Sequence, residues 1–197
     1  MRYNNFILKP DINKFKAYKY IEFDEKEQAI CVVQKHRFGL ILIFVLGIII
    51  SLIGLYAGIF LSISAENSVA NGLTSGSSTS LVILVAGVLF AAITLVVSAV
   101  YGYIYGNNVM LVTSDKIAQV IYTSPINRKI SQLNISDVQD VTIEQKGIFS
   151  RLFNFGTLVI ETAGEQQNYT FTFAANPHYC AKEIMSAREH SISKFGN

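Results

Sequence analysis

Two long stretches of the sequence contain no charged residue and no histidine, and they restrict the possible folds more than any other feature. They run from Phe38 to Ser64 and from Leu81 to Tyr105. An α-helix rises about 1.5 Å per residue and the hydrocarbon core of a bilayer is about 30 Å thick, so about 20 apolar residues span it. A helix that is apolar on every face must be covered on every face, and the rest of a 197-residue chain is too short to cover two such helices. The sequence therefore predicts a hairpin of two transmembrane helices, residues 38–64 and 81–105.

The positions of the basic residues predict how this hairpin is oriented. All 16 Lys and Arg lie outside it, and the connecting loop, residues 65–80, contains none. Because loops rich in Lys and Arg stay on the cytoplasmic side, we expect a multi-pass protein of the cell membrane with both termini in the cytoplasm. The net charge of +2 is small, and the 16 Lys and Arg are divided evenly between the two ends of the chain, so the sequence predicts no single basic patch. We therefore expect no nucleic-acid partner.

Small residues recur at a spacing of four in both predicted helices. The first helix has Gly54 and Gly58, and the second has Ser98, Gly102 and Gly106. Small residues four apart share one helix face and let two backbones approach closely in lipid. The simplest use of these faces is to pack the first helix on the second. The alternative is a homo-oligomer, in which the chain would be a structural subunit of an assembly in the membrane.

After residue 106 the sequence changes to the two-residue alternation that is typical of β-strands. In Tyr169–Phe173, for example, aromatic residues alternate with threonines. The pattern predicts about six short antiparallel strands, followed by an amphipathic helix with Pro177 in its first turn. The predicted fold is thus a membrane α-helical hairpin plus a mainly-β domain, residues 107–190. The C-terminal helix would close one open end of a curved antiparallel sheet or partial barrel.

The two ends of the chain give weaker signals. Residues 1–37 are interpreted as a cytoplasmic N-terminal segment. Its apolar run Ile30–Val33 is too short for periodicity to distinguish a strand from a helix. Residues 191–197 are expected to form a frayed tail.

The run from Val109 to Gly164 resembles the bacterial pleckstrin-homology-like domain family of the membrane-flanked type. The matching elements are Val112-Thr113, Lys116, Ile135–Val141, Gly147, Arg151 and Gly156–Gly164. The resemblance covers most of residues 107–190 and, more loosely, residues 20–105. It implies curved antiparallel strands capped by a C-terminal helix. It does not imply phosphoinositide binding, because that chemistry needs several clustered cations. The adjacent pair Arg128 and Lys129 is interpreted as part of a solvated strand face.

The sequence contains no recognisable catalytic or metal-binding motif. Its three histidines are not accompanied by a nucleophile elbow, an HExxH pair or a phosphate-binding glycine loop. Asp137, Asp140 and Glu144 form an acidic cluster, but Asp137 would point to the opposite face of a strand from the other two. Cys31 and Cys180 belong to no CxxC pair. We expect no catalytic residue, metal or cofactor; an enzyme that uses the acidic strand and a channel formed by a large oligomer are weaker alternatives.

The segment KGIFSRLFNF, which precedes the fifth of these predicted strands, contains the candidate site. In a helical turn Phe149, Leu152 and Phe153 would share one side, with Arg151 pointing elsewhere. These side chains, together with Phe155, could plug the open end of the sheet or contact the bilayer or a partner, and both can hold at once. We take all five residues as candidate contacts. The favoured function is a non-catalytic, membrane-anchored interaction or scaffolding module, whose partners would be the lipid bilayer and either an unidentified protein or a second copy of the chain.

Overall fold

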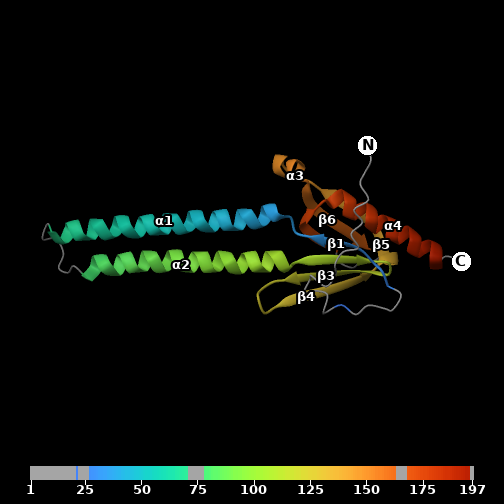
Figure 1. Ribbon diagram of the computed structural model, residues 1–197, viewed down its shortest axis with the longest axis horizontal. Helices are drawn as coiled ribbons and strands as arrows, with labels where there is room; N and C mark the ends of the chain where they lie inside the picture. The colour runs from blue at the N-terminus through green and yellow to red at the C-terminus, as the bar shows by residue number, and fades with distance from the viewer. Residues whose placement is uncertain (1–20, 22–26, 71–77, 163–167, 196–197) are drawn as a thin grey trace. The chain divides into compact units, whose positions relative to one another are not determined.

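In the computed structural model the chain forms two compact units (Figure 1). The structure describes residue 21 and residues 27–70, 78–162 and 168–195, without the side chains of residues 69–70 and 194–195. Most of the predicted N-terminal segment and the centre of the predicted 65–80 loop lie outside the described residues. One unit, residues 40–103, is here called the hairpin, and the other, which contains residues up to 39 and from 104 onward, is called the domain.

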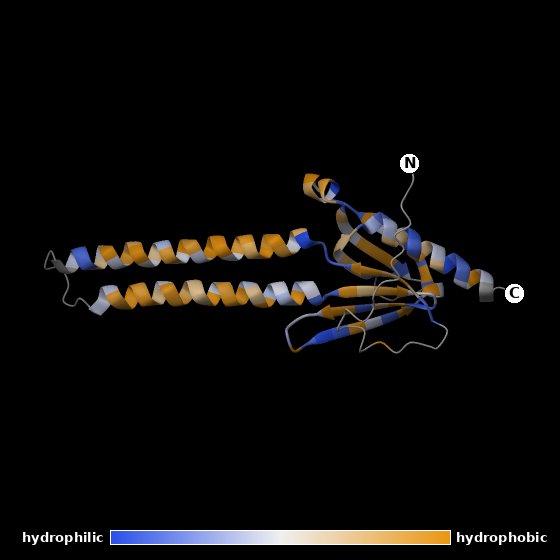
Figure 2. Cartoon of the chain, in the orientation of Figure 1, coloured by the Kyte–Doolittle hydropathy of each residue, from blue (hydrophilic) through white to orange (hydrophobic). Residues whose placement is uncertain are grey.

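The hairpin is formed by helices α1 (Arg37–Ala70) and α2 (Ser78–Asn107). Both are long and apolar enough to cross a membrane, and Figure 2 shows hydrophobic residues along most of their length. Large side chains such as Ile53 and Phe60 are exposed on the outside. Both helices extend beyond the predicted bounds, because the uncharged run marks the part that suits lipid, whereas the backbone hydrogen bonds continue into the polar residues that flank it.

Small residues lie where the two helices of the hairpin meet. The Cα atoms of Gly58 and Gly87 face each other so closely that a Cβ atom added to Gly58 would lie 2.9 Å from Gly87 Cα. The hydroxyl of Ser98 donates a hydrogen bond to the Ile43 carbonyl oxygen at 3.1 Å. Close backbone approach and short polar contacts of this kind hold helices together in an apolar medium.

In the described residues the domain contains two antiparallel sheets. Their strands are β1 (Ala29–Gln34), β2 (Val109–Thr113), β3 (Lys116–Tyr122), β4 (Arg128–Asn134), β5 (Val138–Glu144), β6 (Phe155–Thr162) and β7 (Tyr169–Ala175). The sheet orders are β1-β2-β3-β4 and β5-β6-β7. The short helices η3 (Ile135–Asp137) and α3 (Ile148–Leu152) interrupt the strand sequence, and α4 (Pro177–Phe195) ends it. The prediction of six strands and a final helix after residue 106 is confirmed.

Strand β1 precedes the hairpin in the sequence, yet it pairs with β2, the first strand after the hairpin. Gln34 lies directly opposite Val109 in this antiparallel pair. The hairpin is therefore inserted between two neighbouring strands, and Figure 1 shows the blue β1 within the domain. The domain thus begins with β1 and not at residue 107 as predicted. The sequence did not reveal this because the apolar run in β1 is short and its partner strand lies beyond the hairpin.

A buried ion pair fixes the start of β1. Lys116 Nζ lies 3.1 Å from Glu27 Oε2, and the Glu27 side chain is fully buried. The Thr113 hydroxyl, at the end of β2, also donates a hydrogen bond to the Glu27 carboxylate. Lys116, the basic turn residue in the family resemblance, therefore ties the β2–β3 turn to the chain that leads into β1.

The main core lies between the two sheets and α4. Its largest fully buried side chains include Val33, Met110, Val112, Ile117, Leu158, Ile160, Phe171 and Ile184. Helix α4 contributes Ile184 and Ala187 to this core from one apolar face. Ser191 is still buried one turn further on. Packing against the domain thus continues past Glu189, so α4 extends to Phe195 and most of the predicted tail is helical.

The two cysteines meet in this core. Cys31 comes from β1 and Cys180 from α4, and both are free, buried thiols. A hydrogen bond between them, together with burial, raises the pKa of Cys31, and the same bond lowers the pKa of Cys180. Within the described residues no group of three His, Cys, Asp or Glu side chains could hold a metal ion. The contact between the two thiols joins β1 and α4 within the core.

Candidate functional site

Helix α3 is a single turn whose shape is fixed at both ends. Gly147 precedes it with φ 90° and ψ 168°, a backbone conformation that only glycine adopts without strain. Asn154 follows it with a positive φ of 52°. Directly after β5, the Gln145 side-chain amide donates hydrogen bonds to the carbonyl oxygens of Ser150 at 3.4 Å and Phe155 at 3.1 Å. These contacts hold the turn in one orientation on the domain.

The outer face of α3 is apolar and exposed. Ile148 is 82% exposed, Leu152 70% and Phe149 60%, and the turn carries strongly hydrophobic colour in Figure 2. Arg151 is exposed between them. Single apolar residues are common on soluble surfaces, but a patch of this density in one short turn usually marks an interaction site.

A stack of aromatic rings connects α3 with the start of α1. Phe38 stacks on Phe149, Phe153 and Phe155, with ring centroids 5.7, 5.1 and 5.2 Å apart. Phe155 also stacks on Phe173 of β7 at 5.4 Å. Such offset pairs add to the stability gained by burying the rings. These five phenylalanines are called the aromatic stack below.

The aromatic stack lies at the end of the domain where the chain enters and leaves the hairpin. This junction end comprises residues 34–39 and 104–109. Here the His36 amide donates to the Phe173 carbonyl oxygen at 2.6 Å, and the Tyr105 hydroxyl, near the end of α2, donates to the His36 carbonyl oxygen at 2.8 Å. Phe38 is the first residue of the uncharged run. The exposed face of α3 is thus fixed beside the point where an apolar helix begins.

The five predicted contact residues separate into two groups. Phe149, Leu152 and Arg151 lie on the exposed turn, and Phe153 is partly covered by Phe38. Phe155 is only 8% exposed, so of the two alternatives it takes the inward position that plugs the sheet, and a bilayer or partner contact at Phe155 stays a prediction. Phe155 belongs to β6 and forms the inner base of the stack. Sequence reasoning overlooked Phe38, although its place at the start of the apolar run was a usable signal.

The glycines predicted for helix packing have different surroundings. An added Cβ at Gly54 would meet the ring of Phe90, and one at Gly102 would lie 3.0 Å from the ring of Phe44, in each case on the other helix. An added Cβ at Gly106 would meet nothing within 4 Å. Gly54 and Gly102 thus make their contacts inside the hairpin. A homo-oligomer through these faces stays a prediction.

The acidic residues considered as an alternative catalytic cluster are engaged separately. Asp137 accepts a hydrogen bond from the Asn134 amide at 3.3 Å, and Asp140 accepts one from the backbone N–H of the next residue. Glu144 pairs with Lys146 at 2.7 Å. No shared proton position or metal-binding geometry results from these contacts.

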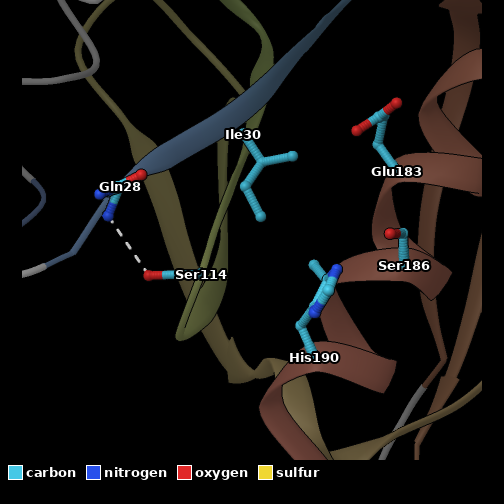
Figure 3. A pocket seen from close by; sticks show the side chains of 7 residues that line it. Gln28, Ile30, Ser114, Glu183, Ser186 and His190 are labelled. Carbon is cyan, nitrogen blue, oxygen red and sulfur yellow. Dashed lines mark hydrogen bonds between the residues drawn. The ribbon is translucent and has the colours of Figure 1, made fainter.

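An open groove of about 360 Å³ lies between β1 and α4 (Figure 3). It is lined by Gln28, Ile30, Ser114, Glu183, Ser186, Ala187 and His190. Glu183, Ser186 and His190 project from α4, and in the part of the chain that the structure describes no hydrogen bond joins these three side chains. A nucleophile, a base and an orienting acid must be linked in this way to act together. The groove therefore lacks the geometry of a catalytic triad.

Two antiparallel sheets of four and three strands, closed by a C-terminal helix, define a pleckstrin-homology-like domain, which here carries an inserted apolar hairpin. The family model described as the bacterial PH domain matches residues 38–188. This is well over half of the chain, so the protein belongs to the bacterial PH domain family. No curated protein and no solved structure matches the chain.

Proposed function

We propose that the hairpin spans the cell membrane with both termini in the cytoplasm, and that the domain serves there as a non-catalytic interaction module held against the bilayer. Two long, apolar helices support the first part, and the distribution of Lys and Arg supports the orientation. Proteins of the PH domain family are generally non-catalytic. The separate engagement of the acidic residues agrees with a module that binds without reacting.

The observation that carries the proposal is the aromatic stack between α3 and Phe38. If α1 spans the bilayer, Phe38 lies where this helix enters it, and Phe149 and Phe153 are in contact with Phe38. Moving a large apolar side chain out of water contributes about 1.5–3 kcal/mol. Ile148, Phe149 and Leu152 would therefore favour the acyl boundary, and the exposed Arg151 can reach the phosphates.

A single tryptophan can test this contact, because the chain contains none. The full chain with Leu152→Trp is reconstituted in phosphatidylcholine vesicles with brominated acyl chains. We expect blue-shifted emission that the bromine atoms quench and that acrylamide in the water quenches little. The matched control is Ile192→Trp, which replaces an exposed isoleucine near the C-terminal end of α4. Its emission should stay red-shifted and sensitive to acrylamide.

The same vesicles show which outcome rules the bilayer contact out. If acrylamide quenches Leu152→Trp as strongly as Ile192→Trp, α3 faces water and the proposal is wrong. Shielding of Leu152→Trp from both quenchers would mean that protein covers α3. A second variant, Leu152→Trp with Phe149→Ser, should lose part of the bromine quenching, because it weakens both the apolar face and the stack.

Thiol labelling tests the orientation separately. Both native cysteines are buried, so a cysteine introduced at an exposed position provides a selective label. Ser78→Cys, at the start of α2, should react with an impermeant maleimide on intact cells. Ser193→Cys, on α4, should react only after the cells are permeabilised. The reverse pattern would contradict the proposed topology.

A further inference from the structure

A second site with an exposed apolar side chain lies at the junction end. It is the turn between β3 and β4, residues 123–127, and the side chain is that of Ile126. Strand β2 leaves the junction end at Val109, and antiparallel β3 returns to it, with Val120 opposite Val109. The Tyr122 amide then donates a hydrogen bond to Asn108 Oδ1 at 2.6 Å. Asn108 directly follows α2. The β3–β4 turn therefore projects past the residue at which the chain leaves α2.

The β3–β4 turn holds Ile126 in the solvent, with 91% of the residue exposed. The Ser124 hydroxyl oxygen accepts hydrogen bonds from the Asn127 amide at 2.9 Å and the Ile126 amide at 3.4 Å. The Asn127 carbonyl oxygen accepts from the amides of Thr123 at 3.0 Å and Ser124 at 3.2 Å. A turn with this many internal bonds has a defined shape. The isoleucine is thus presented outward by a structured element.

Two cations follow Ile126 in the chain. Arg128 and Lys129 begin β4, and both are exposed. From the sequence they were interpreted as a solvated strand face, since nothing there showed where β4 begins in space. Tyr122, which pairs with Arg128, places this start at the junction end. An apolar tip followed by two long basic side chains suits a bilayer surface, where the tip enters the acyl boundary and the cations reach the phosphates.

We infer that the β3–β4 turn is a second bilayer contact, selective for anionic headgroups. The domain would then rest on the membrane at two points, through α3 beside the start of α1 and through Ile126 beside the end of α2. This inference depends on the proposed function, because it requires that the hairpin spans the bilayer. It goes beyond the proposed function by naming a class of lipid, the anionic phospholipids. The reason is that the second contact carries two adjacent cations, whereas α3 carries only Arg151.

The experiment again uses the full, tryptophan-free chain, here with Ile126→Trp. It is reconstituted in vesicles of brominated phosphatidylcholine, either alone or mixed with phosphatidylglycerol. We expect bromine quenching that is stronger in the anionic vesicles and that falls toward the neutral level at high salt. Each cation should shift the balance between inserted and solvated turn by about fivefold, since a basic residue near an anionic surface contributes about 1 kcal/mol.

Charge variants separate the electrostatic part from the apolar part. Arg128→Gln with Lys129→Gln should abolish the difference between anionic and neutral vesicles. The matched control is Lys182→Gln, which removes an exposed cation from α4 and should leave the difference unchanged. Equal quenching of Ile126→Trp in both kinds of vesicle would overturn the selectivity for anionic lipids.

The two tryptophan positions distinguish failure of this inference from failure of the proposed function. If Leu152→Trp is quenched by the brominated lipid and Ile126→Trp is not, the second contact is wrong and the first one stands. If neither is quenched, both are wrong. If Ile126→Trp is protected from acrylamide but not reached by bromine, another protein surface covers the turn, which overturns the inference. Because Ile126 is exposed, the variant should keep the wild-type circular dichroism spectrum and Tm, which checks the fold.

Discussion

The hairpin and the domain arrange their side chains in opposite ways. In the hairpin the small residues Gly58 and Ser98 face the other helix, while large residues such as Ile53 are exposed. In the domain Phe171 and Ile184 are buried, whereas charged residues such as Lys182 and Glu189 are exposed. Each arrangement suits a different solvent, because apolar side chains gain by leaving water but gain nothing by leaving lipid. The direction in which large apolar side chains point thus indicates which solvent a segment is built for.

By this criterion two parts of the domain resemble the hairpin. Helix α3 and the tip of the β3–β4 turn expose large apolar side chains, and both lie at the junction end. Tyr179 and Ile192 are also exposed, and single apolar residues of this kind are common on soluble surfaces. Ile126 is distinguished from them by the two adjacent cations that follow it in the sequence. The side-chain arrangements of the two units therefore differ least at the junction end, which is where we propose that the domain contacts the bilayer. Four experiments test how far this comparison holds.

The largest effect is expected from removing the hairpin with or without β1. A fragment of residues 107–197 lacks β1, which leaves β2 without its edge partner, and it should neither stay soluble nor unfold cooperatively. Gln34 and Val109 lie opposite each other in the β1–β2 pair. Replacing residues 35–108 by Asn-Gly would therefore connect these two strands by a two-residue hairpin turn. This version should elute as a folded domain on size exclusion and show a cooperative thermal transition. A cooperative transition of the 107–197 fragment would contradict the role of β1.

The next largest effect is expected on the free energy of unfolding, when a phenylalanine of the core is shortened and compared with one on the exposed turn α3. Phe171 is 1% exposed, and Phe171→Ala should reduce the free energy of unfolding by about 3–5 kcal/mol. Phe149→Ala should cost about 1 kcal/mol or less, because it loses only the contact with neighbouring rings. Thermal unfolding of the full chain in detergent, followed by circular dichroism, measures both. Equal losses would mean that α3 belongs to the core and not to an interface.

A smaller effect is expected in the hairpin, where Gly58 and Gly106 form a matched pair. Gly58→Ile places a Cβ atom against the backbone of Gly87, whereas the Cβ atom of Gly106→Ile would meet nothing within 4 Å. We expect a loss of about 1–2 kcal/mol of helix association in the first case and none in the second. The rate of disulfide formation between Ser51→Cys and Ala91→Cys, which lie in contact, reports the packing. If Gly58→Ile abolishes an intermolecular cross-link and leaves this rate unchanged, the homo-oligomer alternative is favoured.

The smallest effect concerns the pH dependence of the domain's stability. Burial lowers the pKa of Lys35 below its ordinary 10.5, and its ammonium donates to the Thr172 hydroxyl at 3.0 Å. At pH values between the pKa of Lys35 in the folded domain and 10.5, Lys35 is protonated in the unfolded chain but mostly deprotonated in the folded one. The free energy of unfolding therefore rises with pH across that window. Lys35→Met should flatten this rise in Tm, whereas Lys182→Met, which changes an exposed lysine on α4, should not. An unchanged rise in the Lys35 variant would show that another group causes it.

The sequence by itself determined the features that depend on neighbouring residues in the chain. Charge-free length predicted the two helices, alternation predicted β2 to β7, and Pro177 marked the start of α4. These signals are local, because a helix face or a strand face repeats over a few residues. The apolar turn around Phe149 was found in the same way.

Only the tertiary structure decided which distant segments meet. It placed β1 beside β2 across the hairpin, turned Phe155 inward, and brought Phe38 onto α3. It also placed Arg128 at the junction end. None of these positions follows from periodicity, since each depends on which strands pair and which side chains pack together in space. The physical reason is that a strand pattern specifies which faces are apolar but not which edges become neighbours.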